Sequence, residues 1–209
     1  MPQFNPYILN RNVAPGIAEF THADIPDLRA QFPESEHWLS NHFLNTLLGP
    51  NFKGLFRQYA INMLCRAQAQ FGLYHQAREA TSTYLEKSSH HNPAVRLYYA
   101  AIVLWESCFL NYQIFFDLFV NITGQKWFAK NDGSEEQRAY EIANTIKHWG
   151  GVIQANNHHD DHTIPMWLSN AGFHTHTMEI TYGELAAITT EIAKTADDLQ
   201  NPGAFGRAT

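Results

Sequence analysis

The sequence has little cysteine and few charged residues for its length. Its 209 residues include only 2 cysteines, which is too few for the disulfide framework of a small secreted domain. Cys65 and Cys108 both lie in apolar, helix-like segments, so we expect two buried, reduced thiols. The 20 acidic and 14 basic side chains give a formal net charge of -6. This balance excludes nonspecific coating of nucleic acid, which needs many lysines and arginines, but it leaves room for a local RNA site.

The chain also lacks any segment typical of a signal or a membrane anchor. Its first residues have neither the basic region nor the continuous apolar run of a secretory signal, and no lipidation signature, so we expect a cytoplasmic protein. Segment 94–121 is apolar almost all round, but it carries Glu106 and Asp117, which would be costly in hydrocarbon. We therefore expect this segment to be the buried central helix of a bundle, with Glu106 either hydrogen-bonded to a neighbouring helix or part of a polar site.

Proline divides the chain into two parts. Six of the 9 prolines fall within the first 50 residues. We expect residues 1–54 to form an irregular N-terminal extension with short helices, including one over 34–48, packed on the core. Residues 55–209 then form a single helical bundle domain, which a chain of this length can support.

Helical periodicity and capping residues define four main helices in that domain. The expected helices cover 55–87, 94–121 and 134–149, and the last one starts near residue 181. Asn92 with Pro93, Ser134, and Thr181 with Glu184 supply the expected starts of the last three. Gly150-Gly151 supplies the expected end of the helix over 134–149.

The segment 150–179 is too long for a simple bundle turn and is predicted to be an insertion. Residues 174–178 alternate as a strand does, and the turn residues Asn170-Ala171-Gly172 would pair them with 164–168. The predicted fold is therefore all-α, with a four-helix-bundle-like core and a short β-hairpin or irregular insertion before the last helix.

The helix over 134–149 carries the main functional candidate. Its apolar face holds Ala139, Ile142, Ile146 and Trp149, and a polar arc roughly opposite, directed away from the protein's own core, holds Glu141, Asn144 and His148. One interpretation is a solvated surface, with His148 complementing the negative end of the helix dipole. The other is a groove, formed with a second copy of the chain, in which His148 serves as a general acid or base.

The hexad Ala143-Asn144-Thr145-Ile146-Lys147-His148 resembles the signature of the HEPN superfamily of helical domains. That signature has an arginine, a polar residue, three variable residues and a histidine; here Asn144 and His148 match, and Ala143 replaces the arginine. The resemblance implies a homodimer that binds RNA or a protein partner, and a divergent, metal-independent RNase of a defence or toxin-antitoxin system is one form of it. The implied site is His148 and Asn144, with Lys147 and Glu141 beside them and no cofactor. Whether the protein is an enzyme stays open.

Two alternatives belong to other classes. The first is a metal-binding protein or metal-dependent hydrolase, because imidazoles and carboxylates are ligands for zinc, nickel or cobalt. Its candidate ligands are His158, His159, Asp160, His162, His174 and His176, and we expect the last two to lie on one side of a strand. The second alternative is a non-catalytic interaction protein that forms an oligomer.

Overall fold

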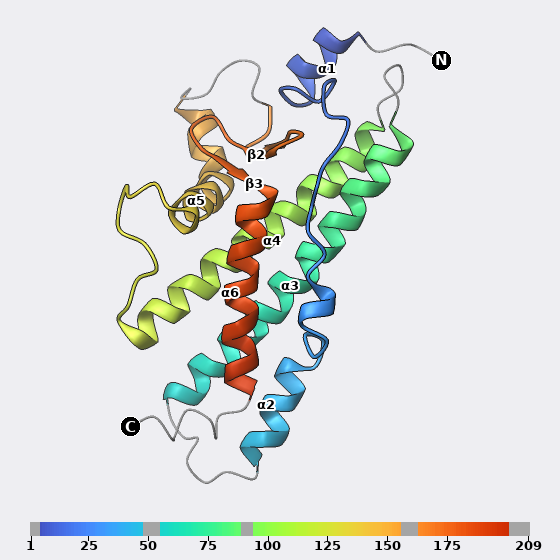
Figure 1. The fold of residues 1–209 in the computed structure, drawn as a ribbon. Coiled ribbons are helices and arrows are strands. Elements are labelled where there is room, and N and C mark those ends of the chain that lie inside the picture. The colour runs from blue at the N-terminus through green and yellow to red at the C-terminus, as the bar shows by residue number, and fades with distance from the viewer. Residues whose placement is uncertain (1–4, 48–54, 89–93, 156–162, 201–209) are drawn as a thin grey trace.

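The computed structural model describes residues 5–47, 55–88, 94–155 and 163–200 (Figure 1). The described residues are 68% helical, and a small three-stranded antiparallel sheet precedes the last helix, so the predicted fold class is confirmed. The elements in chain order are α1 (Pro6–Asn12), η1 (Arg29–Gln31), α2 (Trp38–Leu47), α3 (Leu55–Lys87), α4 (Val95–Thr123), α5 (Glu135–Gln154), β1 (Trp167–Leu168), β2 (Gly172–His174), β3 (Glu179–Thr181) and α6 (Tyr182–Gln200).

The long helices α3 and α4 lie side by side and form the body of the molecule, with α6 against α3 and α5 against α4 (Figure 1). Their shared surface is aromatic: Tyr74 and Trp105 are fully buried, with ring centroids 5.5 Å apart. The Trp105 indole donates a hydrogen bond of 2.9 Å to Thr81 Oγ1. The apolar segment around Glu106 is thus the buried central helix that the sequence predicts. Glu106 itself is partly buried, and burial raises the pKa of its carboxyl.

The N-terminal segment packs along these helices through its own apolar side chains. Leu9, Ile17, Phe20, Leu28 and Phe32 are all buried. The helix predicted over 34–48 starts later, at Trp38, because residues 34–37 form turns instead. Trp38 is fully buried, and its indole donates to Asp197 on α6.

Two expectations about helix starts and cysteines need comment. The helix α4 begins at Val95 with Ala94 as N-cap, and Asn92 and Pro93 lie outside the described residues. Both cysteines are free thiols, as predicted, but only Cys108 is buried. Cys65 is exposed because it lies on the outward face of α3, one residue from the buried Leu64.

The helix α5 starts as predicted and ends later than predicted. Ser134 caps it by accepting a hydrogen bond from the Gln137 backbone. The expectation that Gly150-Gly151 ends the helix is wrong, because α5 continues to Gln154. Neither glycine adopts the positive φ of a glycine cap, and glycine inside a helix costs only about 1 kcal/mol. His148 therefore lies more than a turn before the end, where the helix dipole is weaker.

The insertion forms a hairpin at the predicted turn and one further strand, but the strand expected over 174–178 is wrong, because β2 covers Gly172–His174 and residues 175–178 connect it to β3. β1 pairs with β2 through the turn at Asn170-Ala171-Gly172, and β3, which was not predicted, pairs with β2 on its other side. Gly172 is required there, since a Cβ would lie 2.1 Å from the Ile180 carbonyl oxygen. The last helix begins with the predicted capping box: Thr181 N donates to Glu184 Oε2 at 2.8 Å, and Glu184 N donates to Thr181 Oγ1 at 3.1 Å.

Hydrophobic length gives no sign of a membrane span. Of the helices in the described ranges, none is both long enough and apolar enough to cross a bilayer.

Candidate functional site

A row of polar side chains joins α4 to α5. The Gln113 side-chain amide on α4, only 4% exposed, donates a hydrogen bond of 2.6 Å to Asn144 Oδ1 on α5. Asn144 Nδ2 in turn donates to Glu141 Oε2 at 3.4 Å. One turn earlier on α5, the Tyr140 hydroxyl donates to Asp117 Oδ1 at 3.0 Å. Asn144 therefore faces the neighbouring helix, which corrects the expectation that the whole polar arc points away from the protein's own core.

Helical spacing explains why these groups meet. Gln113, Asp117 and Asn121 are four residues apart on α4, so they share one side of that helix. Tyr140, Asn144 and His148 have the same spacing on α5. We call these two rows, with the pocket at their end, the α4–α5 site.

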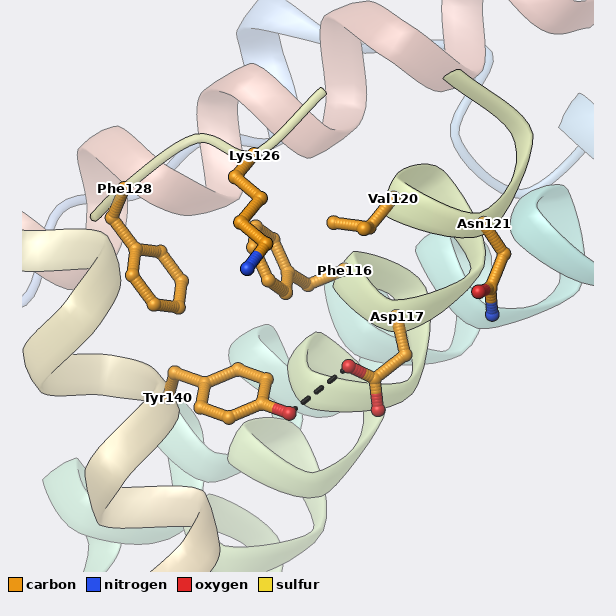
Figure 2. A pocket seen from close by; sticks show the side chains of 7 residues that line it. All are labelled: Phe116, Asp117, Val120, Asn121, Lys126, Phe128 and Tyr140. Carbon is orange, nitrogen blue, oxygen red and sulfur yellow. Dashed lines mark hydrogen bonds between the residues drawn. The ribbon is translucent and has the colours of Figure 1, made fainter. Parts of the chain in front are cut away.

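The pocket at the end of the site has an aromatic floor (Figure 2). Its volume is about 430 Å³, and its lining is Phe116, Asp117, Val120, Asn121, Lys126, Phe128 and Tyr140. Phe116 and Phe128 are stacked, with ring centroids 4.7 Å apart. Tyr140 packs against them, with its ring centroid 5.4 Å from Phe116 and 5.5 Å from Phe128.

Polar groups surround this aromatic floor. Figure 2 shows Asp117 and Asn121 on one side, from α4, and Lys126 reaching over Phe116 from the loop that follows α4. Burial, and then the Asp117 carboxylate, raise the pKa of Tyr140, so its phenol stays neutral and donates to Asp117. The pocket thus offers flat apolar faces together with a carboxylate, an amide and an ammonium group.

The other predicted site residues lie beyond the row of hydrogen bonds. His148 and Lys147 are exposed, and neither makes a hydrogen bond or ion pair with any residue that the structure describes. Ala143 is fully buried in the core. Positions 143 and 148 are five residues apart, so their side chains point about 140° away from each other around the helix. A longer side chain at position 143 would therefore extend into the core and not toward His148.

The expected metal ligands do not form a site within the described residues. His158, His159, Asp160 and His162 lie outside those residues. Of the other two, His174 is the last residue of β2, whereas His176 lies in the turn after it and not on the strand as expected. No group of three or more His, Cys, Asp or Glu side chains suited to a metal ion occurs in the described part of the chain.

His174 instead makes a hydrogen bond within the hairpin and lies beside Glu179 of β3. It lies 2.8 Å from Ser169 Oγ through Nε2 and 3.5 Å from Glu179 Oε2 through Nδ1, an order of groups that resembles a hydrolase triad. However, Ser169 Oγ also accepts hydrogen bonds from the backbone N–H groups of Ala171 and Gly172, both at 3.2 Å. These donors occupy the oxygen lone pairs that a nucleophile needs, so Ser169 closes the turn.

Comparison with known protein families, curated proteins and solved structures finds no match to this chain. The functional argument therefore depends on the geometry of the α4–α5 site. Sequence reasoning named Asn144, Glu141, Lys147 and His148 as candidates but did not indicate the pocket. The four-residue spacing of polar side chains in an apolar helix was a signal for Gln113 and Asp117; Lys126 and Phe128, in a loop, gave none.

Proposed function

We propose that the protein binds single-stranded RNA and holds one unpaired nucleotide in the pocket of the α4–α5 site. The observation that carries this proposal is the aromatic cluster of Phe116, Phe128 and Tyr140 beside one carboxylate, one amide and one ammonium group. Proteins that read single strands use aromatic faces to stack splayed-out bases and polar side chains to bind the base edges.

Each polar group of the pocket has a counterpart on a nucleotide. Asp117 and Asn121 offer acceptors to the amino and imino groups of a base edge, and Lys126 offers a cation to the phosphate. Lys147 lies seven residues beyond Tyr140, about 10 Å along the helix axis. Glu141, Asn144, Lys147 and His148 then contact the neighbouring nucleotide.

The charge of the site favours weak, local binding. With Lys126 and Lys147 as the two phosphate contacts, the logarithm of the binding constant should fall with the logarithm of salt concentration with a slope of about -1.4. Replacing Lys126 by alanine should reduce the slope to about -0.7. A slope far steeper than -1.4 would indicate binding by some other, more basic surface.

The geometry favours binding over cleavage. A general base is held in place by a second group, and His148 has none among the described residues. We therefore expect a mixed-sequence oligoribonucleotide to stay intact during incubation with the protein. Metal-independent cleavage that is lost in His148→Ala would instead support the RNase form of the HEPN resemblance.

Fluorescence anisotropy with a short, unstructured oligoribonucleotide tests the proposal. Phe128→Ala removes one stacking face, which is worth about 1–3 kcal/mol per base, so the affinity should fall at least fivefold. Tyr7→Ala is the matched control, because Tyr7 is 64% exposed and lies on α1. Equal binding by both variants, or binding of a protein partner in place of RNA, would contradict the proposal.

We further propose that the protein forms a homodimer, in which the outward face of α4 contacts the same face of a second copy of the chain. Five residues of α4 follow one another at alternate spacings of three and four, as in the contact between two packed helices: Ala100, Val103, Ser107, Leu110 and Ile114. Val103 is 58% and Ile114 40% exposed, so this face of α4 leaves two large apolar side chains uncovered.

An antiparallel contact about a two-fold axis near residue 105 would match small side chains to large ones. It places Ala100 of one copy opposite Leu110 of the other, and Ser107 of one copy opposite Val103 of the other. We expect a dimer in light scattering that Val103→Glu dissociates and Ile8→Glu, at an exposed position on α1, does not. A monomer at all concentrations would refute the contact.

A further inference from the structure

A second pocket lies between α3 and the segment 29–36, which includes η1. Its volume is about 360 Å³, and it is lined by Arg29, Ser35, Glu36, Gln68, Phe71, Gly72, His75, Gln76 and Glu79. Phe71 and His75 are buried, and their ring centroids lie 4.8 Å apart.

His75 is the unusual member of this lining. Its side chain is only 8% exposed, and neither ring nitrogen has a hydrogen-bond partner among the described residues. The Asp27 carboxylate lies beside the ring, but its Oδ1 is 3.7 Å from Nδ1, which is too far for a hydrogen bond. Burial lowers the pKa of His75 to about 4, so the ring is neutral near pH 7 and has one N–H and one lone pair unmatched. Buried polar groups are rarely left in this state, and a bound ligand is one way to satisfy them.

Several other polar groups of the lining already have partners. Arg29 donates to Asp27 through Nε and Nη2 and to Glu79 Oε1 through Nη1. The Gln68 side chain accepts from the Leu39 backbone at 3.1 Å and donates to the Glu36 carbonyl at 3.1 Å. The groups left for a ligand are therefore the His75 ring, the Glu36 carboxylate and the second carboxylate oxygen of Glu79, together with the neutral side chains of Ser35 and Gln76.

We propose that this pocket binds a small organic cation with a flat apolar body, such as an arylamidine. The two carboxylates select a positive charge, the Phe71 ring offers an apolar face to the body, and His75 accepts a hydrogen bond from the ligand. An anion of the same shape would meet two like charges and no unpaired cation.

Gly72 keeps the pocket open. It lies inside the long helix α3, and a glycine at an interior position makes a helix less stable than an alanine does. A Cβ built on Gly72 meets no atom within 4 Å, so no packing constraint in the described structure demands glycine. Since Gly72 lines the pocket, a methyl group there would occupy space that the ligand needs.

Isothermal titration calorimetry with three molecules of the same shape tests the charge requirement. The probes are benzamidine, which is cationic, benzamide, which is neutral, and benzoate, which is anionic. We expect binding of benzamidine, at least tenfold weaker binding of benzamide, and none of benzoate. Equal binding of all three, or no binding of benzamidine, would overturn the proposal.

Two variants separate binding from folding. Gly72→Ala should raise the melting temperature and weaken benzamidine binding, whereas Gly150→Ala, the matched change in α5, should raise the melting temperature without affecting binding. His75→Phe should weaken binding about tenfold, the value of one hydrogen bond. Unchanged affinity in Gly72→Ala and His75→Phe would place the ligand elsewhere and refute this site. Benzamidine should leave RNA binding unchanged, so the two proposals fail independently.

Discussion

His75 should make the protein unusually sensitive to mild acid. In the folded chain burial lowers its pKa from the ordinary 6.5 to about 4, while the unfolded chain regains the ordinary value. Between these two values only the unfolded state takes up the proton, so stability falls as pH decreases and is unaffected by His75 above pH 7. The expected loss from His75 alone is about 2 kcal/mol between pH 7 and pH 5, and about 3 kcal/mol by pH 4.

His75→Phe isolates this effect. Phenylalanine keeps a ring beside Phe71 and Tyr74 and removes the two unsatisfied nitrogens. Chemical denaturation gives the free energy of unfolding at pH 7, 6 and 5. Between pH 7 and pH 5 this free energy should fall by about 2 kcal/mol less in His75→Phe than in the wild-type protein. The variant should also be the more stable protein at pH 7, because it buries no unmatched polar atom. Parallel pH curves for the two proteins would show that His75 is hydrogen-bonded or accessible to water, and would refute the reasoning.

Three further predictions concern a contact within the α4–α5 site, the α6 cap and the small sheet. Asn144→Ala should lower the free energy of unfolding by about 1–3 kcal/mol, because the buried Gln113 amide loses its acceptor. Denaturant unfolding should show that the double variant, Asn144→Ala with Gln113→Leu, regains part of this loss; simple additivity of the two single changes would contradict a coupling between the two side chains. Thr181→Ala should cost about 1 kcal/mol, or roughly 2–4 °C in melting temperature, through loss of the α6 cap; an unchanged melting temperature would contradict that cap. Gly172→Ala should disrupt the pairing of β2 with β3 at a cost above about 2 kcal/mol, because its Cβ would lie 2.1 Å from the Ile180 oxygen; a normal near-ultraviolet spectrum and wild-type stability would be inconsistent with this packing.

Local rules were sufficient for most helix starts and for the place of the hairpin, but not for the bounds of its strands. Ser134 and Thr181 cap α5 and α6 as predicted, since a cap depends on only a few neighbouring residues. Gly150-Gly151 failed as a stop because a glycine ends a helix only when it adopts a positive φ. The sequence does not show which glycines do so.

The site was harder to predict because it depends on contacts between helices. The helical phase of α5 placed Asn144 opposite Ile142, but Gln113 could be assigned as its partner only once α4 and α5 were in contact. The pocket further requires Phe128 and Lys126, which come from the loop between the two helices. Loop side chains carry no periodic signal, so their convergence on Phe116 and Tyr140 could not be derived from the sequence.

The central claim is that an unpaired nucleotide occupies the pocket of the α4–α5 site. Photocross-linking with an oligoribonucleotide that carries 4-thiouridine, followed by mass spectrometry of the peptides, tests this claim most directly. The account predicts cross-links on the segments that contain Phe116, Phe128 and Tyr140, and their loss in Phe128→Ala. Cross-links confined to other segments, or the absence of any cross-link, would contradict it.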